Sequence, residues 1–174
     1  MLLSGGEVLN QEEIIFRNIE IKRDLKLIYN AMSLYETKNR TPFKVLNTSS
    51  LQEFEDLLRN RLRFFFHDFL IIENQNSKYL GLAFSYDYRS YDGHCKIAVL
   101  VGNDSMDDWV VFAEAFQNYL FSLYPLRKLF LEVDDNQRRL EVYRKAGFKT
   151  ECVLSEYHFC KGTFCDVVIM SKER

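Results

Sequence analysis

The sequence contains no long apolar run. No stretch of about 18 consecutive apolar residues occurs, so no segment is suited to crossing a membrane as a helix. The opening residues, MLLSGGEVLNQEE, also lack the basic region and the apolar core of a secretory signal. We therefore expect a protein that has no membrane partner and is located in the cytoplasm.

An excess of charge of one sign is missing as well. The 23 Lys and Arg residues against 25 Asp and Glu residues leave a formal net charge of −2, and the basic residues form no block. A protein that binds nucleic acid usually carries a basic patch or stripe. We therefore expect no nucleic-acid partner.

Cysteine is scarce. The four cysteines, Cys95, Cys152, Cys160 and Cys165, are too few and too scattered for a disulfide framework in a chain of this size, so reduced thiols are expected. Cys160 and Cys165, with His158 close by, suggest a metal site, but their spacing is not that of a zinc knuckle. Residues that face each other across a hairpin explain this spacing better, and we expect no metal.

Apolar and aromatic residues are abundant. They make up 47% and 15% of the 174 residues, enough to bury a large core in a single domain covering residues 1–174. Strand-like and helix-like patterns alternate along the chain. The expected strands cover residues 14–21, 69–73, 79–88, 96–101 and 128–133, with a hairpin over 148–170. The expected helices run over residues 23–35, from Ser50 to Phe65, from Trp109 to Leu123, and from Asn136 to Gly147.

The most informative stretch is residues 126–149, LRKLFLEVDDNQRRLEVYRKAGFK. Residues 128–133 are apolar at almost every position on both faces, which predicts a strand inside a layered α/β domain. Residues 134–136 then supply side-chain acceptors for the free amides of a helix start. Gly147 permits the left-handed residue that ends such a helix. The stretch therefore predicts a strand, a tight turn, a short helix and a glycine stop.

This stretch also carries a recognisable pattern. The matching residues are Asn136, Leu140, Tyr143, Gly147 and Phe148. In this spacing they resemble the last coenzyme-binding helix of the GNAT superfamily of acetyl-coenzyme A (acetyl-CoA) dependent N-acetyltransferases. A second set is similar to the C-terminal hairpin of the branch that includes ribosomal-protein and spermidine N-acetyltransferases. It consists of Phe159, Gly162, Asp166 and Met170. The resemblance implies an α+β fold with a mixed, mostly antiparallel central sheet of about seven strands, splayed between the fourth and fifth, and about four helices.

By this resemblance, acetyl-CoA is the cosubstrate, and the acetyl group passes directly to an amine. Tyr143 is expected to protonate or hydrogen-bond the departing sulfur; alternatively, its ring only packs on the sheet with the hydroxyl at the rim. Leu100, Val101 and Gly102 are expected to bond the pantetheine arm through their main chain, as an added strand would. Asn136 is expected to bind pantetheine or to position the base, or else only to cap the helix.

The general base is harder to assign. Glu132 is a carboxylate on an otherwise apolar strand, which needs a reason. It serves as the base, or it pairs with a basic side chain. His94 and His158 titrate in the right pH range, but a lone histidine at a strand end is more often structural.

The turn after Gly102 departs from the family pattern. GNAT domains carry a glycine-containing loop there, whose bare amides at a helix start hold the pyrophosphate. The residues of this chain at that place are Asp104, Ser105, Met106, Asp107, Asp108, Trp109 and Val110. Ser105 and Asp108 are expected to cap the helix and satisfy the same amides. Compensation is expected from a basic side chain that reaches the phosphates from the last helix, namely Arg139 or else Arg138, Arg144 or Lys145.

Two functions therefore remain open. The first is an acetyl-CoA-dependent N-acetyltransferase acting on a primary amine of a small molecule or on a peptide N-terminus. The second is a catalytically impaired GNAT-fold module that binds a ligand or a partner. The acidic turn separates the two, because it weakens coenzyme binding through charge repulsion. A homodimer is an open alternative to a monomer.

Overall fold

The computed structural model describes residues 13–38, 50–102, 105–134, 137–160 and 162–174, in which seven strands and four helices occur. In chain order the elements are β1 (Ile14–Asn18), α1 (Ile21–Lys38), α2 (Leu51–Phe64), β2 (Phe66–Asn74), β3 (Tyr79–Arg89), β4 (His94–Val101), α3 (Met106–Leu123), β5 (Lys128–Asp134), α4 (Gln137–Lys145), β6 (Lys149–Cys160) and β7 (Thr163–Glu173). None of the helices in these ranges is long and apolar enough to span a membrane.

The strands form one sheet in the order β1-β2-β3-β4-β5-β7-β6. Neighbouring strands are antiparallel except for β4 and β5, which are parallel. A parallel pair needs a crossover connection, and α3 supplies it. This is the mixed, mostly antiparallel sheet that the family resemblance implies, so the fold class is confirmed.

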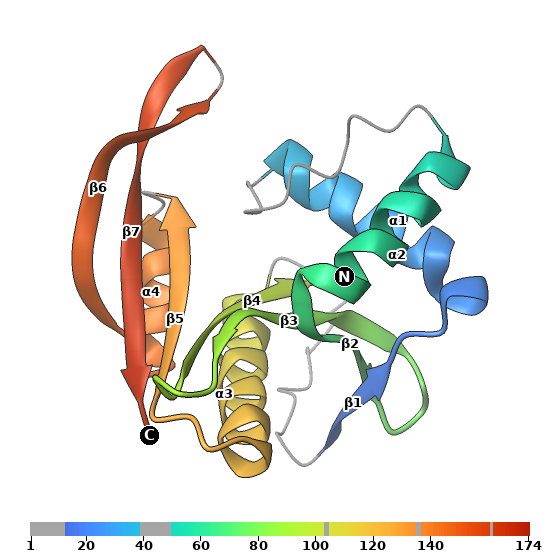
Figure 1. Cartoon of the computed structure of the whole chain (residues 1–174), viewed down its shortest axis with the longest axis horizontal. Helices are drawn as coiled ribbons and strands as arrows, with labels where there is room; N and C mark the ends of the chain where they lie inside the picture. Colours follow the sequence, from blue (N-terminus) through green and yellow to red (C-terminus); the bar gives the residue numbers. More distant parts are fainter. Residues whose placement is uncertain (1–12, 39–49, 103–104, 135–136, 161) are drawn as a thin grey trace, which may run out of the picture.

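β4 and β5 pair through their backbones only at their starts. Their pairing consists of three residue pairs, from His94 with Lys128 to Lys96 with Phe130, although β4 continues to Val101. Figure 1 shows the two strands separating, so that β1 to β4 lean away from β5, β6 and β7. The splay between the fourth and fifth strands is therefore confirmed.

Helices cover both faces of the sheet and create two cores (Figure 1). The first core lies under α3 and α4, and the second lies under α1 and α2. Residues of the first core include Ile97, Val99, Phe112, Phe116, Leu131 and Tyr143. Residues of the second core include Ile28, Phe54, Leu58, Phe69, Phe84 and Leu100. Because alternate residues of a strand face opposite ways, β4 contributes to both cores.

The chain enters α1 earlier than the sequence predicts. A strand was expected over residues 14–21, but β1 ends at Asn18 and α1 begins at Ile21. Asp24, in the first turn of α1, accepts the Glu20 amide at 2.7 Å and an Arg17 guanidinium N–H at 2.8 Å. The first bond satisfies the amide of Glu20, the residue that precedes the helix, and both bonds fix Asp24, so they favour a helix start at this point over a longer strand.

The end of α4 follows its sequence signals. Gly147 has a φ of 86°, in the left-handed region that favours glycine. The Gly147 amide donates to the Arg144 carbonyl, and the Phe148 amide donates to the Tyr143 carbonyl, both at 2.9 Å. The predicted glycine stop is therefore confirmed, and it folds Phe148 back towards Tyr143.

The cysteines differ from one another. Cys95 is a buried free thiol, and burial raises its pKa to about 12. Cys152 is an exposed free thiol. Cys165 is disulfide-bonded, so the expectation of reduced thiols is wrong for this residue.

Candidate active site

Tyr143 lies on the buried face of α4. Its side chain is 4% exposed and belongs to the first core, with its ring edge-on to Phe148 at a centroid distance of 5.9 Å. The hydroxyl is therefore not at a solvent-exposed rim. Burial raises the pKa of the phenol, and a hydrogen bond from Arg139 with its positive charge opposes that rise. Tyr143 is protonated at neutral pH, as a proton donor has to be.

Arg139 precedes Tyr143 by one helical turn and lies on the same face of α4. It is 6% exposed, although an arginine is seldom buried to this extent. Its guanidinium carbon lies 5.7 Å from the centroid of the Trp109 ring, and the group donates to the Tyr143 hydroxyl. Because Trp109 belongs to the first turn of α3, Arg139 connects the start of α3 with the buried face of α4.

α3 begins at Met106 and is capped by Ser105. The Ser105 hydroxyl accepts the Asp108 amide at 3.3 Å, as the sequence predicts. Asp107 is exposed and Asp108 is buried, so two carboxylates lie in the first turn. The first amides of an α-helix have no acceptor within the helix and therefore favour an anion, whereas the carboxylates repel one.

The side chains of Trp109 and Val110 act mainly in packing. Val110 packs against the first core, and Trp109 packs against the second. The indole therefore lies where the two cores approach each other. Its Nε1 atom is buried and has no hydrogen-bond partner in the part of the chain that the structure describes. A buried donor without an acceptor costs free energy, so a ligand with an acceptor at this position would be favoured.

Only every second residue of β4 directs its backbone at the splay. The Gly102 amide donates to the Leu80 carbonyl of β3 at 2.7 Å, and a Cβ on Gly81 would collide with the Leu100 carbonyl oxygen. Gly102 and Leu100 therefore bond to β3, and the residues between them turn the other way. The backbone groups of Val99 and Val101 therefore point to the opposite edge of β4, where β5 no longer pairs with it. Of the three predicted backbone contacts, the structure thus directs only Val101 at the splay.

Glu132 forms an ion pair next to the point where the strands separate. Lys96 Nζ donates to Glu132 Oε1 at 2.7 Å, and Asp87 Oδ2 lies 3.9 Å from the same nitrogen. Glu132 was expected either to act as the base or to pair with a basic side chain, and the structure shows the ion pair. A role for Glu132 as base stays a prediction, and it requires Lys96 to move. Lys96 was not predicted as a site residue, although it is the only charged residue in the run CKIAVLV.

The remaining candidates do not extend the site. Asn136 and Asp104 lie outside the described residues. The His94 ring lies edge-on to Phe130 at 5.4 Å, and His158 lies against Tyr157 at 5.0 Å on the last hairpin. Among the described residues, no group of three or more His, Cys, Asp or Glu side chains is arranged to hold a metal.

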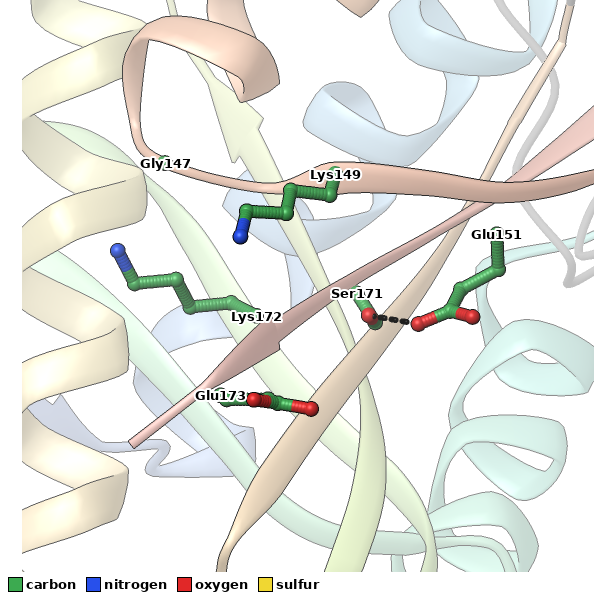
Figure 2. Close-up of a pocket in the computed structure, with 6 residues that line it drawn as sticks. All are labelled: Gly147, Lys149, Glu151, Ser171, Lys172 and Glu173. Atoms are coloured by element: carbon green, nitrogen blue, oxygen red, sulfur yellow. Dashed lines mark hydrogen bonds between the residues drawn. The ribbon is translucent and has the colours of Figure 1, made fainter.

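A cavity of ≈ 200 Å³ lies at the C-terminal end of α4. Its lining consists of Gly147, Lys149, Glu151, Ser171, Lys172 and Glu173. Figure 2 shows Lys149 and Lys172 extending towards the same side, whereas Glu151 turns to Ser171. Hydrogen bonds from Lys128 and Ser171 lower the pKa of Glu151. Cations at a helix C-terminus complement the helix dipole, so we interpret this cavity as a structural feature. No predicted site residue lines it.

Known structures share this architecture. No protein-family model and no curated protein matches the sequence. A spermidine N-acetyltransferase from Vibrio cholerae, solved in complex with CoA and spermine, superposes with a TM-score of 0.80 at 19% identity, covering 93% of this chain and 96% of that chain. A chimeric form of that enzyme gives a TM-score of 0.79 at 20% identity, covering 92% and 95%. The chain therefore has the fold of these N-acetyltransferase structures.

Proposed function

We propose that the protein is an acetyl-CoA-dependent N-acetyltransferase. It transfers the acetyl group to a primary amine of a small molecule or of a peptide by direct attack. The fold shared with the spermidine N-acetyltransferases makes polyamines the first acceptors to test. The proposal does not depend on the identity of the amine.

One observation carries the proposal: the splay between β4 and β5 beside a buried tyrosine. Val99 and Val101 turn backbone groups into the splay, where an extended pantetheine arm can bond as an added strand. Tyr143 packs in the same core as Val99 of β4 and Leu131 of β5. A donor group lined up along β4 would therefore bring its thioester towards the phenol.

Acetyl transfer exchanges one bond at the acetyl carbon and requires two proton transfers, and each proton transfer has a group to perform it. The amine nitrogen attacks the thioester carbon and the carbon–sulfur bond breaks. Tyr143 gives its proton to the departing sulfur, and the amine loses a proton to Glu132 or to water. The products are an N-acetylated amine and a free thiol, and the phenol is restored by a proton from solvent. No covalent bond to the protein forms.

The second candidate function is a binding module that has lost ordinary coenzyme affinity. It is favoured by the start of α3, where Asp107 and Asp108 lie in the turn that would meet the pyrophosphate. Two like charges about 5 Å apart repel by roughly 1 to 3 kcal/mol at an effective dielectric constant of 20 to 80. This lowers affinity without removing it, which is why we rank the enzyme first.

Calorimetric titration separates the two functions. The enzyme predicts acetyl-CoA binding with a Kd in the micromolar range, followed by thiol release when spermidine, spermine or a peptide amine is added. The binding module predicts no heat at millimolar acetyl-CoA. Binding without thiol release for any amine would retain the coenzyme site and reject the transferase.

A further inference from the structure

Arg139 and Tyr143 form a buried pair on one face of α4. Arg139 donates to the hydroxyl of Tyr143 and lies over the face of Trp109, and both Arg139 and Tyr143 are buried. A guanidinium in such surroundings is costly unless its contacts compensate. The hydroxyl and the indole face are two such contacts. They also fix the guanidinium between the start of α3 and the buried face of α4.

Resting on the proposed function, we propose that Arg139 is a positioning residue for proton transfer by Tyr143. It fixes the direction of the phenol oxygen and stabilises the phenolate that exists once the proton has moved to sulfur. Trp109 contacts the same guanidinium through the face of its ring. Arg139 thus acts on the acetyl transfer through the Tyr143 hydroxyl.

The chemistry explains why such a group is needed. A free thiol has a pKa of about 8.5 and a free phenol one of about 10, so the transfer from phenol to thiolate is uphill before the protein acts. Burial makes it more uphill, because an apolar environment disfavours the phenolate. A cation that donates to the oxygen favours the phenolate. The positive charge and the hydrogen bond of Arg139 oppose the rise that burial causes in the pKa of Tyr143.

The described part of the first core around Tyr143 is apolar. From α3, the first core contributes Ala113 and Phe116, and from β5 it contributes Leu131 and Val133, all of them apolar. Phe148 covers the ring edge. The start of α3 and the acidity of the phenol are therefore coupled through Arg139.

Replacement of Arg139 separates this role from binding of the coenzyme phosphates. Arg139→Met is expected to lower kcat about 10-fold or more and to leave the KM for acetyl-CoA nearly unchanged. The alkaline limb of the kcat profile should move to higher pH, because Tyr143 then holds its proton more tightly. Arg139→Lys keeps a cation and should recover part of the rate. Arg59→Met removes an exposed helical guanidinium and serves as the matched control.

Three results would overturn the inference. A rise in KM alone would make Arg139 a phosphate ligand. A lower kcat with an unmoved alkaline limb would make it a structural residue, and unchanged kinetics would give it neither role.

A measurement without turnover keeps the test separate from the proposed function. Carbon-13 at the tyrosine Cζ, assigned with Tyr143→Phe, reports ionisation of this phenol directly. Between about pH 7 and about pH 11, the Tyr143 resonance of Arg139→Met should begin to shift at higher pH than that of the wild type. If the Tyr143 resonance has the same pH dependence in the wild type and in Arg139→Met, with or without a shift, the positioning role is overturned, even in a protein that transfers acetyl groups. A clear difference in a protein that transfers none would reject only the proposed function.

Discussion

Arg17 joins three elements at the β1 edge of the sheet. Its guanidinium donates to both carboxylate oxygens of Asp24, at 2.8 and 3.0 Å, and to Glu73 Oε1 at 3.0 Å. The two acidic side chains are only 3% and 9% exposed. Arg17→Met keeps an apolar stem of similar shape and removes the charge. The only other cation near both carboxylates in the described part of the chain is Arg23, 3.8 Å from each and 54% exposed.

These contacts set the size of the expected effect. Removing one partner of a buried ion pair usually costs about 3 to 5 kcal/mol, because the charge left behind stays buried. Arg23 and the Glu20 amide remain near Asp24, so we expect the lower end, about 3 kcal/mol. In a domain of this size 1 kcal/mol corresponds to roughly 2 to 4 °C. Arg17→Met should therefore lower Tm by about 6 to 12 °C.

Urea unfolding and calorimetry measure this loss directly. Arg59→Met is the control, because Arg59 pairs with Glu55 at 2.6 Å on the exposed face of α2. Exposed pairs contribute about 1 kcal/mol or less. If Arg17→Met costs no more than Arg59→Met, burial does not strengthen this network and the reasoning is refuted.

The same network gives a pH dependence. Burial alone would raise the pKa of Asp24, but hydrogen bonds from Arg17 and from the Glu20 amide outweigh burial and lower it. Because the folded pKa lies below the unfolded value, the stabilisation is complete above about pH 4 and is lost as the pH falls through the folded value. The stability difference between wild type and Asp24→Asn should therefore shrink below about pH 4.

Three predictions concern the site. Tyr143→Phe should lower kcat about 100-fold with unchanged acetyl-CoA affinity, by thiol-release kinetics and calorimetry; an unchanged kcat would remove Tyr143 from the mechanism. If Glu132 is the base, Glu132→Gln should lower kcat about 10-fold or more and Lys96→Met should not; equal losses would show that only the ion pair matters. Asp107→Lys should tighten acetyl-CoA binding severalfold, because an exposed repulsive charge becomes attractive; weaker binding would show that Asp107 builds the turn.

The sequence predicts best those parts of the fold that depend on neighbouring residues. The glycine stop at Gly147 and the serine cap at Ser105 are decided within one helical turn, and both are confirmed. The early end of β1 was not predicted, because it depends on hydrogen bonds from Arg17 to Asp24 and to Glu73. Glu73 lies in β2, which neighbours β1 in the sheet but is far from it in the sequence. Contacts of that kind leave no periodic signal.

The site follows the same division. Tyr143 could be selected from a local pattern, whereas the contact of Arg139 with Trp109 depends on a helix far away in the sequence. Glu132 could be noticed as an acid on an apolar strand, but Lys96 as its partner depends on the register of a parallel pair that only the structure gives. The alternation that turns Val101 towards the splay likewise depends on how β4 pairs with β3.

The seam of three residue pairs between β4 and β5 gives the sheet an edge in its interior. Amides at such an edge, those of Val99 and Val101, should exchange with solvent deuterium faster than their neighbours Ala98 and Leu100, whose backbone groups bond to β3. An extended molecule that hydrogen-bonds along this edge of β4 would protect the amides of Val99 and Val101 from exchange. It would also join the two halves of the sheet. The free energy of unfolding would then rise as the site fills, by about 2.7 kcal/mol at a ligand concentration of 100 times Kd.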